Sequence, residues 1–157
     1  MKVSGRGIRE HLKLLTPLFG VIGAVWALRF ILGAIGAPML LVKVFSVGVF
    51  VPICVILAAL LIHLKRFGGY ASVVLSSFLL VVWGQVLIVA AILLTLLFGI
   101  VNIYTAPEFS IPGDAGHVRH ILGHLTFGVG LETLIGSLMG CLILFMLRRA
   151  KPASRKP

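Results

Sequence analysis

Long runs of apolar residues occupy most of the chain, and short polar or glycine- and proline-containing segments separate them. Four such runs extend over residues 14–36, 39–63, 70–101 and 119–147. A helix needs about 20 predominantly apolar residues to cross a bilayer, and each run supplies them. The pattern therefore predicts an all-α integral membrane protein, with four transmembrane helices in an antiparallel bundle.

The lengths of the runs and the residues that interrupt them predict further features. The run over 70–101 is longer than a bilayer requires, so its helix is expected to tilt, kink or protrude. Pro52 is expected to kink the second helix, because proline removes a backbone hydrogen bond from a helix interior. Residues 102–118 are rich in turn-forming residues and are expected to form an extracytoplasmic loop. Asp114 in that loop can cap the helix that follows.

The basic residues are concentrated beside the apolar runs. The net charge of +10 alone would suggest a nucleic-acid partner. However, the Lys and Arg residues gather in the leader 1–13, the turn 65–69 and the tail 148–157, which flank the runs. Such positions favour the cytoplasmic side of a membrane with anionic lipid. We therefore expect N-in/C-in topology, a multi-pass protein of the bacterial cytoplasmic membrane, and no nucleic-acid partner. The leader is expected to form a short interfacial helix or to be an unstructured basic segment.

Apart from Arg119, which starts the last run, the formally charged residues inside the runs are Arg29, Lys43 and Glu132. Lys43 is near enough to a run end to reach the headgroups. Arg29 and Glu132 lie about 10 Å and about 12 Å below the same surface, at 1.5 Å per residue. Because an unpaired charge at that depth is costly, we expect them to form an ion pair, with Gln85 as an uncharged partner. The pair would either fix helix register or form a proton- or ligand-responsive site.

Three histidines follow the extracytoplasmic loop at helical spacing. His117, His120 and His124 fall on one face of a helix, and Glu132 lies deeper on the flank of the same face. Imidazoles at this spacing can share a metal ion, with Glu108 or Asp114 as oxygen ligands. They can also hydrogen-bond headgroups or water, or relay protons. A haem held jointly with His63 is disfavoured, because the topology places that residue at the opposite membrane surface.

Small residues recur at a spacing that lets helix backbones approach closely. Gly136 and Gly140 form such a pair in the last run, and Ser72 and Ser76 form another in the third. This spacing predicts helix packing within the bundle or between two copies of the chain.

No nucleotide-binding or hydrolase motif is present, so we expect a non-enzymatic protein. The leading hypothesis is a subunit or scaffold of a membrane complex, whose partners are other membrane subunits or further copies of the chain. One alternative is a small proton-coupled transporter that uses Glu132 and Arg29. Another is a redox subunit that binds a metal ion or haem through the histidine face. Without such a site, no cofactor is expected.

Overall fold

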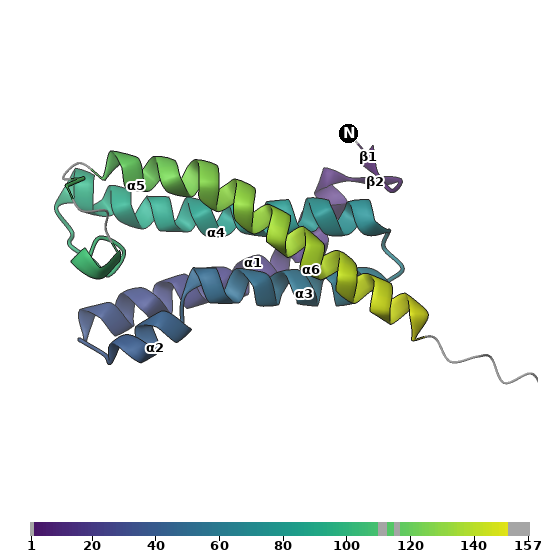
Figure 1. The fold of residues 1–157 in the computed structure, drawn as a ribbon, viewed down its shortest axis with the longest axis horizontal. Helices are drawn as coiled ribbons and strands as arrows, with labels where there is room; N and C mark the ends of the chain where they lie inside the picture. Colours follow the sequence, from purple (N-terminus) through teal and green to yellow (C-terminus); the bar gives the residue numbers. More distant parts are fainter. Residues whose placement is uncertain (1, 110–112, 115–116, 151–157) are drawn as a thin grey trace, which may run out of the picture.

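The computed structural model describes residues 2–109, 113–114 and 117–150, and it consists almost entirely of helices that lie side by side (Figure 1). Four helices are long and apolar enough to cross a membrane. They are α1 (Ile8–Ala34), α3 (Val47–Leu64), α4 (Tyr70–Phe98) and a continuous helix over Val118–Arg149. The prediction of an all-α bundle built from four apolar helices is therefore confirmed.

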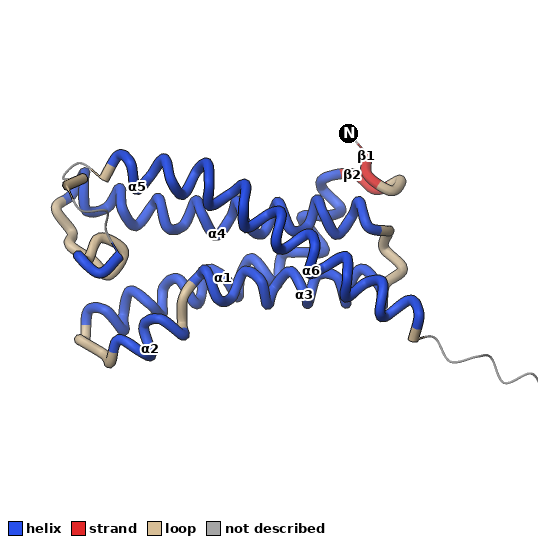
Figure 2. The backbone as a smooth tube through the Cα atoms, viewed as in Figure 1, coloured by secondary structure: helices blue, strands red, loops and turns tan. Residues whose placement is uncertain are grey.

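The helices pack in an order that decides which side chains can meet. The last helix packs against α3 and α4, and α1 packs against the same two helices. The helices α3 and α4 therefore lie between α1 and the last helix. Figure 2 shows the connections gathered at two ends of the bundle. The N-terminal strands and the α3–α4 turn lie at one, called the basic end, and the α1–α2 and α4–α5 connections lie at the other, called the loop end.

The leader differs from its prediction. Strands β1 (Lys2–Val3) and β2 (Arg6–Gly7) form a small antiparallel hairpin, and α1 begins at Ile8 without a break from the first apolar run. Ser4 and Gly5 both have positive φ, 51° and 78°, which is the backbone of a two-residue hairpin turn. The carboxylate of Glu10 accepts the Gly7 N–H at 2.7 Å and so caps α1. A separate interfacial helix is therefore absent from this segment.

The second apolar run forms two helices rather than one. A short helix α2 (Met39–Val44) is separated from α3 by Phe45 and Ser46. Ser46 is extended and its carbonyl accepts the N–H groups that start α3. Serine, valine and glycine are weak helix formers, so the sequence Ser46-Val47-Gly48 favours an interruption here. The break thus precedes Pro52, which lies inside α3.

The third long helix ends three residues before its predicted limit. Gly99 adopts φ +67°, a left-handed conformation that terminates α4. The Asn102 side chain then organises the next turn: it donates to the Ala91 carbonyl and to Thr95 Oγ1, both at 2.9 Å, and accepts the Tyr104 N–H. A single 3-10 turn, η1 (Pro107–Phe109), follows. These contacts fold the loop back over the end of the bundle.

The predicted small-residue faces pack inside the bundle. A Cβ added at Gly136 would lie 2.6 Å from Ser77 Oγ, and one added at Gly140 would lie 2.7 Å from a Val73 methyl group. Ser76 is fully buried in α4. The glycines therefore allow the last helix to approach α4 closely.

Candidate functional site

The histidine segment forms the first part of the last long helix. This helix consists of α5 (Val118–Gly123), a π-helical turn η2 (His124–Gly128) and α6 (Val129–Arg149). The Asp114 carboxylate accepts the backbone N–H of His120 at 2.9 Å, so it satisfies a free donor of the first turn. The helix itself starts at Val118, with His117 as the preceding cap residue. Asp114 is thus committed to the helix terminus.

His124 connects a second histidine to a glutamine on another helix. Its Nε2 lies 3.1 Å from His120 Nε2, and its Nδ1 lies 2.6 Å from Gln85 Oε1. The rings of His120 and His124 are 4.9 Å apart between centroids, whereas those of His117 and His120 are 6.3 Å apart. Two of the three predicted histidines therefore contact each other directly, whereas His117 lies outside the helix, as the cap residue that precedes it.

The backbone around Gly128 is shaped to accept Gln85. Gln85 comes from the middle of α4 and is 1% exposed. A Cβ added at Gly128 would lie 2.9 Å from its amide carbon and oxygen, so any larger residue would have to displace this amide. Gly128 ends the π-helical turn, and such turns occur frequently at functional sites. The π-helical turn and the missing side chain of Gly128 together leave room for the amide of Gln85 between His124 and Glu132.

That next residue is Glu132, one turn into α6. The Gln85 side chain interacts with the Glu132 carboxyl group, while Glu132 Oε2 is buried and has no hydrogen-bond partner. Glu132 also lines a cavity of about 200 Å³ between α3 and α6, together with Gly48, Pro52 and Val55. Apart from Glu132, the residues that line this cavity are apolar or glycine. The four residues His120, His124, Gln85 and Glu132 are called the polar chain below.

Arg29 lies outside the polar chain. No ion pair joins Arg29 to Glu132, so the expected Arg29–Glu132 pair is not formed. The reason is the packing order, because α3 and α4 lie between the helices that carry the two residues. The Arg29 guanidinium instead stacks on two aromatic rings of the loop end, 4.7 Å from the Tyr104 centroid and 4.6 Å from the Phe109 centroid. Aromatic faces attract a cation that has no anionic partner.

Metal binding at the histidine face stays a prediction. Over residues 2–109, 113–114 and 117–150, no group of three or more His, Cys, Asp or Glu side chains is arranged to hold a metal ion. Glu108 is exposed in η1, and His63 lies at the basic end, beside Arg148. A shared ion would therefore require His117 or a loop carboxylate to approach the His120–His124 pair.

Several residues that shape this end of the bundle had no clear signal in the sequence. Tyr104 is only 3% exposed, and its hydroxyl donates to the Trp26 carbonyl at 3.3 Å. Burial raises the pKa of this phenol above its ordinary value. In the sequence, Tyr104 and Phe109 are ordinary aromatic residues of a loop, and Gly128 is an ordinary glycine of a helix. Their roles depend on Arg29 and Gln85, which lie on other helices.

The fold and site define a helical bundle with four helices apolar enough to cross a membrane and a partly buried polar chain between α4 and the last helix. Comparisons with protein-family models, curated proteins and solved structures gave no match.

Proposed function

We propose that this chain is a multi-pass membrane protein that acts as a small proton-coupled carrier, with Glu132 as its exchange site. The observation that carries this proposal is the position of Glu132. Glu132 is the innermost member of the polar chain, where its carboxyl group interacts with Gln85, and its side chain lines the cavity between α3 and α6.

The chemistry of a membrane-embedded carboxyl group supplies the coupling. An unpaired carboxylate is strongly disfavoured at membrane depth, so the group either carries a proton or pairs with a cation. Arg29 does not serve as that cation, because it stacks on Tyr104 and Phe109. A proton and a small cationic solute therefore compete for Glu132. Such competition is the thermodynamic basis of exchange.

The rest of the polar chain has two roles in this proposal. Gln85 does not titrate, so it orients His124 and Glu132 rather than carrying a proton itself. The His120–His124 pair can pass a proton between its two rings, because the facing Nε2 atoms lie 3.1 Å apart. Protons would thus enter at the loop end, through His120 and His124, whose neighbour Gln85 interacts with Glu132.

A vesicle assay tests this function. The full chain is reconstituted in liposomes that contain a pH-sensitive dye, and an outward gradient of tetramethylammonium is imposed. We expect inward proton movement with the wild type and its loss in Glu132→Gln. The matched control is Glu108→Gln, which removes an exposed carboxylate outside the long helices and should leave the flux unchanged. Equal flux in wild type and Glu132→Gln, or none in the wild type, would contradict the proposal.

A second candidate is a subunit or scaffold of a membrane complex. The most apolar window of the last helix has 17% of its residues buried, against 33% to 39% in the other three long helices. Its exposed side chains form a leucine stripe at helical spacing, composed of Leu131, Leu134, Leu138 and Leu142. A partner helix would cover this stripe. Purification in mild detergent tests the idea, since a monodisperse monomer with its own flux activity would favour the carrier instead.

The orientation belongs to the same proposal. We place the basic end at the cytoplasmic side of a bacterial inner membrane, because the basic residues beside the long helices gather there. A reporter fused after Pro157 should be active only in the cytoplasm, and extracytoplasmic activity would reverse the assignment.

A further inference from the structure

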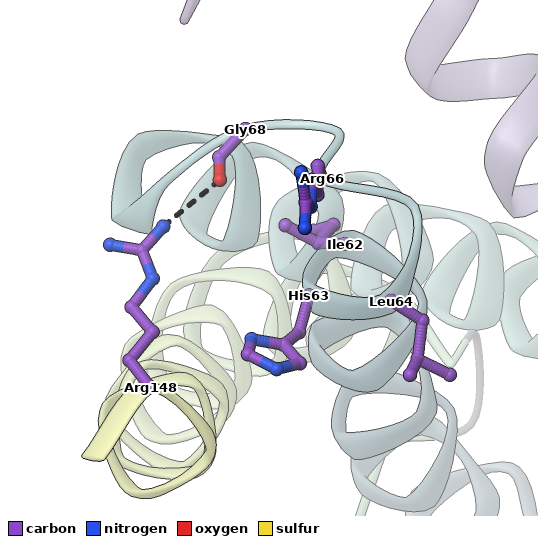
Figure 3. A pocket seen from close by; sticks show the side chains of 6 residues that line it. All are labelled: Ile62, His63, Leu64, Arg66, Gly68 and Arg148. Carbon is purple, nitrogen blue, oxygen red and sulfur yellow. Dashed lines mark hydrogen bonds between the residues drawn. The ribbon is translucent and has the colours of Figure 1, made fainter. Parts of the chain in front are cut away.

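A second cavity lies at the basic end, far along the bundle from the polar chain. Its volume is about 640 Å³, and it opens between the ends of α3 and α6 and the turn that starts α4. Figure 3 shows its lining residues, among them His63, Arg66 and Arg148. None of the lining residues is acidic.

The guanidinium of Arg148 is fixed at the rim of this cavity. One of its nitrogens donates to the Gly68 carbonyl at 3.0 Å, as Figure 3 shows, and the group stacks on the Tyr70 ring at 5.0 Å. A guanidinium carries five N–H donors, so the Gly68 contact leaves others for a ligand. A cation that is already positioned loses less conformational entropy when it binds an anion.

Arg66 occupies a backbone position that normally favours glycine. It has φ +47°, and it ends α3 in a Schellman motif: the Phe67 N–H bonds to the Ile62 carbonyl at 2.9 Å, and the Arg66 N–H bonds to the His63 carbonyl at 3.1 Å. Glycine is the usual residue here, because other residues are strained at positive φ. Arginine at this position brings a second cationic side chain to the cavity. Strain that is kept at one position points to a functional requirement.

Helix dipoles do not account for an anion site here. The N-terminus of α4 would attract an anion, but the C-termini of α3 and α6 lie at the same end and would repel it. The Schellman motif satisfies two carbonyls of α3 and so weakens that repulsion. The attraction therefore comes mainly from the side chains of Arg66 and Arg148. Arginine pairs with phosphate oxygens through two parallel hydrogen bonds.

The surroundings indicate a lipid rather than a soluble anion. The cavity lies at the ends of long apolar helices, at the level where headgroups would lie. Leu64 lines it and is 67% exposed, and Tyr70 beside it is 42% exposed. An exposed leucine next to arginines suits an acyl chain that continues from a bound headgroup, and tyrosine is enriched at membrane interfaces.

We propose that this cavity binds the phosphate of an anionic phospholipid, with Arg66 and Arg148 as its ligands. The inference is independent of the proton-coupled function, because it uses neither the polar chain nor Glu132. Basic cavities between membrane helices are suited to such headgroups.

Native mass spectrometry of the full chain in mild detergent tests the site. Phosphatidylglycerol and phosphatidylcholine are added in parallel, and the fraction of protein that retains each lipid is measured. We expect preferential retention of phosphatidylglycerol, and a fall in its apparent affinity of about fivefold in Arg66→Gly and in Arg148→Gln. Arg66→Gly is informative because it relieves the positive φ and so preserves the fold. Lys43→Gln, which removes an exposed cation of α2, is the matched control and should retain lipid like the wild type.

Three results would overturn the proposal. The first is equal retention of the two lipids by the wild type. The second is unchanged retention of phosphatidylglycerol in Arg66→Gly. The third is displacement of the lipid by millimolar inorganic phosphate, which would identify a soluble-anion site instead.

Discussion

His120 and His124 face each other through their Nε2 atoms, which are 3.1 Å apart. Only one of the two nitrogens can carry the shared proton, so the tautomers of the rings are coupled. With Gln85 Oε1 as acceptor at 2.6 Å, His124 is protonated on Nδ1 and accepts at Nε2. His120 then donates from Nε2 and leaves its buried Nδ1 without a proton or a partner.

This coupling predicts two different neutral tautomers in one protein. Solid-state NMR of the chain with nitrogen-15-labelled histidine should show His124 as the Nδ1–H form and His120 as the Nε2–H form. Replacing Gln85 with leucine removes the acceptor at Nδ1, so the His124 preference should be lost. Identical tautomers for the two rings in the wild type would contradict the hydrogen-bond order.

A methyl group at Gly128 should disrupt the polar chain. Gly128→Ala places a Cβ 2.9 Å from the Gln85 amide, and the overpacking should cost about 1–3 kcal/mol of unfolding free energy. Chemical unfolding in detergent micelles measures this loss. Gly130→Ala is the matched control, since nothing lies within 4 Å of its added Cβ. Alanine there should be neutral or should stabilise the helix by up to about 1 kcal/mol. Equal effects of the two substitutions would refute the close approach.

Arg29 and Glu132 should contribute to stability independently. Because they form no ion pair, a double-mutant cycle of Arg29→Gln and Glu132→Gln should be additive within about 0.5 kcal/mol. Arg29→Gln alone should cost about 1 kcal/mol, since it removes the cation from the Tyr104 and Phe109 rings. Unfolding of the wild type, both single variants and the double variant in one detergent gives the coupling. A coupling energy well above that limit would indicate an interaction that the packing order does not provide.

The apolar runs predict where the long helices lie in the sequence, but they do not predict which helices pack against each other. Arg29 and Glu132 were expected to pair because their depths along the chain agree. Depth carries no information about which helices touch, and α3 and α4 lie between the two residues. Gln85 does meet Glu132, but its other partner is His124 rather than Arg29. The polar chain depends on packing order and on the room left by Gly128, and neither follows from a pattern of apolar residues.

The same limit applies to the local breaks in the helices. The sequence predicts a kink at Pro52 in the second run, whereas the helix is interrupted earlier, at Phe45–Ser46. The leader is expected to be an interfacial helix or an unstructured segment, but Ser4 and Gly5 adopt the positive φ values of a hairpin turn, and the helix begins only at Ile8. Short-range turn chemistry decided both segments, and it competes with helix periodicity over only a few residues.

Tyr104 should make the protein sensitive to alkaline pH. A tyrosine in an unfolded chain has a pKa of about 10, and burial raises the pKa of Tyr104 in the folded protein. Above about pH 10 the unfolded chain therefore loses this proton first, while the folded protein keeps it. The contribution of Tyr104 to stability is complete below that pH and is lost as pH rises toward the folded-state pKa.

In Tyr104→Phe this contribution to the pH dependence should disappear, although the hydrogen bond to the Trp26 carbonyl is lost at every pH. Unfolding of both proteins across the alkaline range, with Tyr70→Phe as the control at an exposed tyrosine, measures the difference. Parallel pH profiles for wild type and Tyr104→Phe would show that the phenol is not held neutral by the fold.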